Sequence, residues 1–197
     1  IISTGMCDVK DVEEAVTTIQ KTGNDKIIIM HCVSDYPSKP EDANLNVMMK
    51  LKEKFQIPVG YSDHSVDILT CLAATAMGAN IIEKHLRHTE NTSSPDDMHS
   101  LTVDEFQNLV NNIRYFEKTM GDGIKKPTSA ELKNRPVSRV SIIALCDIPK
   151  GSIITSNVID VRRPGTGIPP KFFQEIIGKT VIKEIKKDQP LNFDDFN

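Results

Sequence analysis

The sequence predicts an α/β protein in which the later half of a (β/α)8 TIM-type barrel is followed by a small β-rich domain. Up to Gly121, short apolar runs alternate with stretches whose apolar residues recur at helical spacing, the pattern of βα units on a parallel sheet. After Pro136 the pattern changes to short β-like runs broken by Pro- and Gly-containing turns. The βα units fill half of a barrel of ~250 residues, and the first apolar run begins at Ile1.

The elements of the first part follow from local patterns. Short apolar runs predict strands at residues 1–2, 26–32, 58–61 and 80–85. Helical spacing of apolar residues predicts helices over 9–19, 45–55 and 66–77. The last helix has the clearest start signal, because Thr102 and Glu105 have the spacing of a capping box, and Gly121 is expected to end it.

Composition divides the chain into three segments. Residues 1–122 form the barrel part, and residues 123–137 are polar, basic and bounded by prolines, which is typical of a linker. Residues 138–197 form the small domain, with β-like runs at 139–145, 152–155 and 179–185.

Charge and cysteine usage exclude several classes of protein. The 197 residues include 24 Lys plus Arg and 27 Asp plus Glu, giving a formal net charge of −3, so we expect neither nucleic-acid nor membrane binding through a basic surface. No apolar run approaches the ~18 residues of a membrane helix, and the first residues do not resemble a signal peptide. Four scattered cysteines favour a reduced, cytoplasmic protein.

Titratable side chains follow the third and fourth expected strands. In parallel α/β folds the reacting groups lie at the carboxyl ends of the strands. His64 and His85 would end adjacent strands, where two imidazoles can hold one divalent ion, although each can equally bond a backbone group. Glu83 shares a face with His85 by strand alternation, and it is expected to be a general base, the partner of a metal-bound water, or one member of a surface salt bridge.

Other polar residues have more than one interpretation. Small hydroxyl donors suited to a phosphate or carboxylate, but equally to caps and turns, start the loops: Ser3, Thr4, Ser34 and Ser62. Arg163 lies in a stiff Arg-Arg-Pro-Gly turn that either grips a carboxylate or polyol or is a plain surface turn. His88 and His99 fall in the polar loop after the fourth strand, where we expect simple solvation.

Several motifs occur together and in order: Ser3-Thr4-Gly5-Met6, 31–37 (HCVSDYP), 60–64 (GYSDH), 82–85 (IEKH), Pro95-Asp96 and Arg163-Pro164-Gly165. This set resembles the sialic acid synthase family (N-acetylneuraminate synthase and its relatives) over essentially the whole chain. The resemblance implies a TIM barrel followed by an antifreeze-like SAF (β-clip) domain. It also implies condensation of phosphoenolpyruvate with an N-acetylated aldose such as N-acetylmannosamine, giving N-acetylneuraminate and phosphate, with Mn²⁺ or Mg²⁺ as the metal.

The same resemblance assigns roles to individual residues. His64 and His85 match the metal-binding histidines, and Glu83 matches a catalytic acid close to the metal. The positions around phosphoenolpyruvate are matched by Ser3, Ser34, Tyr36 and Ser62. The acceptor sugar lies where the family has Tyr36, Asp96 and Arg163, the arginine reaching the partner subunit's sugar site in a domain-swapped homodimer.

Some residues depart from the family pattern. The usual His-Phe-Thr is His85-Leu86-Arg87 here, Ser94 replaces the usual glycine before Pro95-Asp96, and Asp97 stands where a histidine is usual. These positions lie in the acceptor loop, so legionaminic or pseudaminic acid synthase is an alternative. A non-catalytic sugar-binding module and a metal-dependent hydrolase are alternatives of other classes. The glutamate and lysine that early barrel strands supply in the family have no match here, so these 197 residues alone are expected to be inactive and poorly stable.

Overall fold

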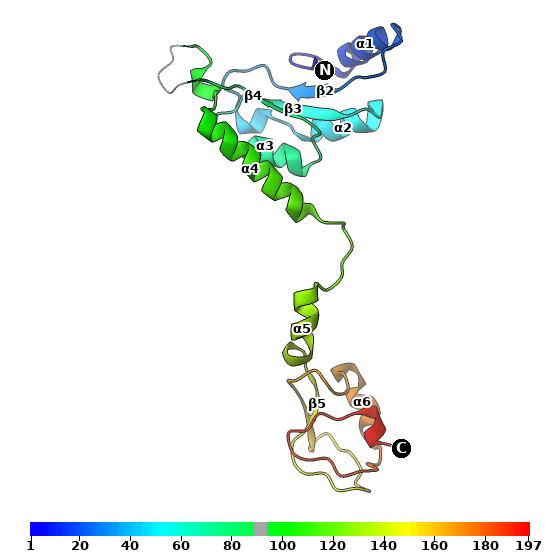
Figure 1. Ribbon diagram of the computed structural model, residues 1–197. Helices are drawn as coiled ribbons and strands as arrows, with labels where there is room; N and C mark the ends of the chain where they lie inside the picture. The colour runs from blue at the N-terminus through cyan, green and yellow to red at the C-terminus, as the bar shows by residue number, and fades with distance from the viewer. Residues whose placement is uncertain (89–93) are drawn as a thin grey trace. The chain divides into compact units, whose positions relative to one another are not determined.

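The computed structural model describes residues 1–88 and 94–197, which divide into two compact units, Ile1–Ile124 and Lys125–Asn197 (Figure 1). Within these residues, no helix combines the length and apolar character that a bilayer crossing requires.

The described part of the first unit is built on a four-stranded parallel sheet, whose strands in spatial order are β1 (Ile2–Ser3), β2 (Ile29–Cys32), β3 (Val59–Asp63) and β4 (Ile82–Lys84). Strands that are neighbours in the sequence are neighbours in the sheet, so all four carboxyl ends lie along one rim. The register places Ser62 beside Glu83 and Asp63 beside Lys84. The predicted parallel α/β class, in the strand order of half a barrel, is confirmed.

The predicted helices of the first unit are all present: α1 (Val9–Gln20), α2 (Asn46–Phe55), α3 (Leu69–Ala76) and α4 (Val103–Met120). The capping box that starts α4 is confirmed, because Thr102 Oγ1 accepts from the Glu105 N–H while the Glu105 carboxylate accepts from the Thr102 N–H at 2.7 Å. Among the described residues of this unit, two short 3-10 helices, η1 (Pro40–Asp42) and η2 (Asp97–His99), lie between the main elements.

The core of this unit lies between the sheet and its helices. Ile29, Val59 and Tyr61 project from one face of β2 and β3 and pack against buried residues of α1, α2 and α3, namely Val12, Val16, Met48, Leu51 and Ala74. A smaller cluster of Cys71, Leu101 and Leu109 joins α3 to α4. Each fully buried aliphatic side chain stabilises the fold by ~1.5–3 kcal/mol. The apolar core therefore holds the strands of the sheet in place, and their carboxyl ends position the polar side chains of the rim.

The second unit is small and β-rich, as predicted. It contains β5 (Ser141–Ala144) and β6 (Ile159–Arg162), which pair in antiparallel fashion, with η3 (Pro170–Phe172), α6 (Phe173–Ile176) and η4 (Phe193–Asp195). Its core includes Ile142, Ile154, Ile168, Ile185 and Leu191. The expected runs at 152–155 and 179–185 make isolated bridges, such as Ile153 with Thr180, rather than strands, and β6 was not predicted.

A helix occupies most of the segment that composition assigns to the linker and extends one residue beyond it. This is α5 (Ser129–Ser138), which begins at a second capping box formed by Thr128 and Glu131. All of its residues are exposed, so its start is fixed by local hydrogen bonds rather than by a buried face.

Candidate functional site

The site is built at the carboxyl ends of β3 and β4, where side chains alternate between two directions. Asp63 and Lys84 point to the helix side and form a buried ion pair, with Lys84 Nζ 2.8 Å from Asp63 Oδ2. Lys84 Nζ also donates to the backbone carbonyls of Ser65 and Asp67. His64 follows Asp63 and His85 follows Lys84. Because successive side chains alternate in direction, both histidines lie on the rim.

His64 is held as a neutral imidazole. Its Nδ1 lies 3.0 Å from the Val33 carbonyl oxygen, and because a carbonyl can only accept, Nδ1 carries the proton. Burial lowers the pKa of His64, which outweighs the opposing effect of this backbone hydrogen bond. The lone pair is therefore on Nε2, as a metal-ligating histidine with a backbone partner requires.

Five side chains gather at this rim, and we call them the histidine cluster: Tyr36, His64, His85, Asp96 and His99. The Tyr36 ring centroid lies 4.3 Å from that of His64, and the His64 and His85 centroids are 5.2 Å apart. The His85 and His99 centroids are 4.6 Å apart. The structure thus brings together four predicted site residues, from the loop after β2, from the ends of β3 and β4, and from the loop that contains η2.

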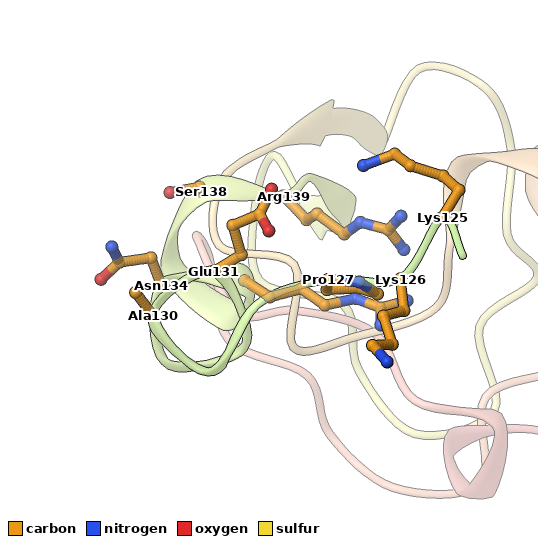
Figure 2. A pocket seen from close by; sticks show the side chains of 9 residues that line it. Lys125, Lys126, Pro127, Ala130, Glu131, Asn134, Ser138 and Arg139 are labelled. Carbon is orange, nitrogen blue, oxygen red and sulfur yellow. The ribbon is translucent and has the colours of Figure 1, made fainter. Parts of the chain in front are cut away.

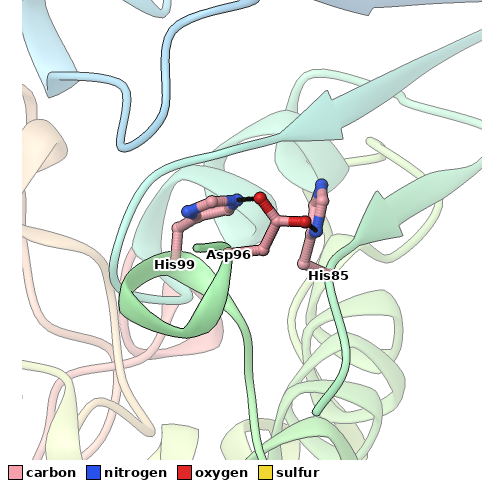
Figure 3. A group of neighbouring side chains, drawn as sticks. All are labelled: His85, Asp96 and His99. Atoms are coloured by element: carbon pink, nitrogen blue, oxygen red, sulfur yellow. Dashed lines mark ion pairs between the residues drawn. The ribbon is translucent and has the colours of Figure 1, made fainter. Parts of the chain in front are cut away.

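Asp96 lies between two of the imidazoles (Figure 3). Its Oδ2 is 3.8 Å from His85 Nδ1, and its Oδ1 is 3.8 Å from His99 Nε2. One ligand atom from each of His85, Asp96 and His99 lies within 4.8 Å of the others. Imidazole nitrogen with carboxylate oxygen is a donor set suited to a divalent metal ion.

The expectation that His99 is solvated is wrong. Its side chain is only 1% exposed, and neither ring nitrogen has a hydrogen-bond partner within residues 1–88 and 94–197. The chain returns from η2 to the end of β4, where the Leu101 N–H donates to the His85 carbonyl at 2.9 Å and the Arg87 N–H donates to the Leu101 carbonyl at 2.8 Å. This pairing carries His99 to the rim, and no local pattern in the sequence signals it. His88 is exposed, as expected.

Glu83 and Ser62 form a second feature of the rim. Ser62 is buried, and its hydroxyl donates to Glu83 Oε1 at 2.7 Å across the β3–β4 register. Glu83 itself is exposed. A carboxylate that is oriented by one hydrogen bond and open to solvent is placed to exchange a proton with a bound molecule.

The other predicted phosphate-site residues are placed separately. Ser3 is exposed at the end of β1, where its Oγ accepts from the Gly5 N–H at 3.4 Å. Ser34 is half-buried beside Cys32 in a hollow of about 370 Å³ that Thr4 also lines. Thr4 is engaged, because its hydroxyl donates to the Met30 carbonyl at 3.0 Å.

Arg163 belongs to the second unit. It follows β6, and its Nε donates to the Ser138 carbonyl at 3.2 Å. A hollow of about 730 Å³ in the same unit is shown in Figure 2 and is lined by basic residues around one acid: Lys125, Lys126, Arg135, Arg139 and Glu131. Its lining is exposed, whereas the histidine cluster combines burial with metal-ligating groups, so we take the cluster as the candidate site.

Arg87 is a further site residue that sequence reasoning did not single out. With His85, Asp96 and Ser100 it lines a hollow of about 250 Å³ beside the cluster. Its Nε is buried and has no hydrogen-bond partner in the described chain. A guanidinium in this position is suited to an anionic group of a bound molecule.

Comparison with known proteins matches two family models to this chain and finds relatives that are named as acid synthases. The NeuB family model matches residues 1–125, and the SAF domain model matches residues 139–197. The chain is 40% identical over 191 residues to N,N'-diacetyllegionaminic acid synthase of Campylobacter jejuni, covering 96% of this chain and 57% of the relative. It is 38% identical over 196 residues to pseudaminic acid synthase of the same species, covering 100% of this chain and 57% of that relative.

A solved structure shows the same similarity. It is N-acetylneuraminic acid (sialic acid) synthetase from Leptospira borgpetersenii in complex with citrate, with 36% identity and a TM-score of 0.61. The match covers 67% of this chain and 46% of that one. The chain therefore spans a little over half the length of the curated relatives described above.

Proposed function

We propose that this chain, which belongs to the NeuB family and carries a SAF domain, is part of a nonulosonic acid synthase that condenses phosphoenolpyruvate with an N-acetylated aldose. The observation that carries the proposal is the histidine cluster on the strand-end rim of the unit that matches the family. In the reaction, carbon 3 of phosphoenolpyruvate bonds to the aldehyde carbon, water adds at carbon 2, and phosphate leaves to give a 2-keto acid. With N-acetylmannosamine as the acceptor, the product is N-acetylneuraminate.

A divalent ion, Mn²⁺ or Mg²⁺, fits the cluster. His64 offers Nε2 because its other nitrogen is hydrogen-bonded to Val33, and His85 stands at the end of the adjacent strand. We propose these two histidines as metal-binding residues. When bound, the ion would act as a Lewis acid toward the aldehyde oxygen of the sugar.

Glu83 is the proposed catalytic residue. Ser62 fixes one carboxylate oxygen by its 2.7 Å hydrogen bond, which leaves the other free to accept a proton. We assign Glu83 as the general base that takes the proton from the water adding at carbon 2. Ser62 keeps the carboxylate in place and is itself proposed as a phosphoenolpyruvate contact.

Five further residues are proposed as substrate contacts. Ser3, Ser34 and Tyr36 supply hydroxyl groups for the phosphate and carboxylate of phosphoenolpyruvate. Tyr36 is half-exposed and packs on His64, so its outer face and the half-exposed Asp96 can hold the acceptor sugar. Arg163 is proposed to complete the sugar site of the partner subunit in a domain-swapped homodimer.

A second class of acceptor sugar is a candidate substrate. The relative named N,N'-diacetyllegionaminic acid synthase is 40% identical to the chain, against 36% for the solved N-acetylneuraminic acid synthetase. This favours a test of the acceptors that lead to legionaminic and pseudaminic acid beside N-acetylmannosamine. The four cysteines are free, which fits the proposed cytoplasmic, reducing setting.

The test is phosphate release from phosphoenolpyruvate by the intact protein, with its mass checked first and with Mn²⁺ present. We expect release that depends on an N-acetylated aldose and a 2-keto acid product detected by mass spectrometry. Binding of the sugar without release would support the sugar-binding module instead. Release without any sugar would favour a hydrolase, and either result would overturn the proposal.

A further inference from the structure

We propose that His99 is a third imidazole ligand of the site and that, with His85 and Asp96, it makes the site prefer nitrogen-binding transition metals such as Co²⁺ and Zn²⁺ over Mg²⁺. The inference deepens the proposed function and rests on it only in placing the ion at the same rim. It concerns a residue for which the sequence predicted solvation.

The first observation is the state of the His99 side chain. It is 1% exposed, yet both ring nitrogens lack a hydrogen-bond partner among the described residues. Burial of a polar group without a partner is unfavourable, so buried imidazoles normally bond a carbonyl, a carboxylate or a metal. His31 shows the ordinary solution, because its ring nitrogen lies 2.8 Å from the Ala43 carbonyl. His99 has instead a ring nitrogen directed at Asp96 (Figure 3).

The second observation is the geometry of the three side chains. The two nitrogen–oxygen distances to Asp96 are both 3.8 Å, too long for hydrogen bonds, and the three ligand atoms lie within 4.8 Å of one another. Ligand atoms bound at about 2.1 Å to one ion lie roughly 3.4 Å apart in a tetrahedral site. Side-chain movements of about an ångström would therefore bring all three atoms onto a common ion.

The backbone holds these residues together. His85 and Leu101 are joined by a hydrogen bond, and the Ser100 hydroxyl donates to the Asp96 carbonyl at 2.6 Å. These hydrogen bonds hold the segment that carries Asp96 and His99 beside the end of β4 before any ligand arrives. The His64 ring lies 6.0 Å from that of His99 and 5.2 Å from that of His85, close enough to complete the site.

The donor set determines which metals are favoured. Mg²⁺ prefers oxygen ligands and retains water, whereas imidazole nitrogen suits Zn²⁺ and other late transition metals. A site with only two histidine ligands and water at its other positions can still bind Mg²⁺. A third imidazole, from a buried residue whose ring nitrogens make no hydrogen bond to the described chain, shifts the preference toward the nitrogen-binding ions.

The direct test is titration of the intact metal-free protein with Co²⁺, followed by its visible d–d absorption and by calorimetry. We expect His99→Gln to weaken Co²⁺ binding by about tenfold or more and to change the band intensity, since the coordination number changes. His88→Gln, which alters an exposed histidine, is the matched control and should leave both unchanged. Equal Co²⁺ affinity and spectra in wild type and His99→Gln would overturn the inference.

A second variant gives a signal that a packing role cannot produce. His99→Cys places a thiolate in the site, so Co²⁺ should show a sulfur-to-metal charge-transfer band only if residue 99 contacts the ion. If His99→Gln fails to fold, Asp96→Asn replaces it, because that side chain is 48% exposed and its loss should still weaken Co²⁺ binding. A folded His99→Cys protein without the band would contradict the assignment.

The outcomes also separate this inference from the proposed function. If wild type releases phosphate from phosphoenolpyruvate in a sugar-dependent manner but His99→Gln binds Co²⁺ normally, the function stands and the ligand assignment fails. If Co²⁺ binds through residue 99 but no sugar-dependent release occurs, the ligand assignment stands and the proposed function fails.

Discussion

The Nζ atom of Lys84 lies 2.8 Å from Oδ2 of Asp63, and both side chains are completely buried one residue before the two histidines of the rim. Asp63 also accepts hydrogen bonds from the N–H and the hydroxyl of Ser65, so several donors stabilise its negative charge. The pair joins the ends of β3 and β4 on the helix side of the sheet. It therefore sets the spacing of His64 and His85.

Removal of one partner of this pair is expected to destabilise the first unit. In Lys84→Met the Asp63 carboxylate stays buried without its cation, which costs about 3–5 kcal/mol. Urea unfolding at pH 7.5 measures the change, and Co²⁺ affinity should fall in parallel because the two histidines lose their common support. The double variant Asp63→Asn with Lys84→Met should recover more than half of the loss. A single variant within about 1 kcal/mol of wild type would contradict this account.

Glu83→Gln is expected to lower kcat with little effect on metal affinity. Loss of a general base typically costs about 10²–10⁴ in rate, while the cluster that is proposed to bind the ion is untouched. Ser62→Ala should lower kcat less, because it only frees the carboxylate that the 2.7 Å hydrogen bond holds. Steady-state kinetics of the intact protein measure kcat, and a Co²⁺ titration of the same variant measures its metal affinity. A Glu83→Gln enzyme with unchanged kcat would exclude the assigned role.

His31 is expected to make the stability of the first unit depend on pH. Burial lowers its pKa despite the backbone hydrogen bond to Ala43, so the folded state disfavours the charged ring. Its contribution is complete above the unfolded value of about 6.5 and is lost as the pH falls below it. Between pH 7 and 5.5 we expect His31→Gln to flatten the fall in unfolding free energy. One group changes this slope by at most about 1.4 kcal/mol per pH unit.

One control variant accompanies the urea-unfolding measurement. His88→Gln removes an exposed histidine and should leave the pH dependence of urea unfolding as it is in wild type. A His31→Gln protein whose stability falls with acid as steeply as wild type would show that other groups cause the dependence.

The capping box of α4 is expected to contribute measurably to stability. Thr102→Ala removes the side-chain acceptor for the Glu105 N–H, which costs about 0.5–2 kcal/mol. Hydrogen exchange of the amides at 103–106 should accelerate. Thr128→Ala breaks the equivalent box of α5 in the other unit and should leave those amides unchanged. Unaltered exchange in Thr102→Ala would show that packing alone fixes the start of α4.

Much of the fold was predictable because its signals are local. Apolar runs gave the four strands of the parallel sheet, helical periodicity gave α1 to α3, and the Thr102–Glu105 spacing gave the start of α4. In the second unit the signal was weaker. β6 was missed, and two expected runs form isolated bridges instead of strands, because pairing in a small antiparallel domain depends on partners far apart in the chain.

The sequence by itself determined that His64 and His85 follow two successive strands, because strand ends have short-range patterns and the βα repeat predicts that successive strands of a barrel are neighbours. Only the tertiary structure decided that His99 joins them. Its position depends on the hydrogen bonds between Leu101 and the β4 end, which join residues far apart in the chain, whereas the polar composition of the segment predicts exposure to solvent. The Ser62–Glu83 contact was likewise decided by the register of two strands, which side-chain alternation within one strand does not fix.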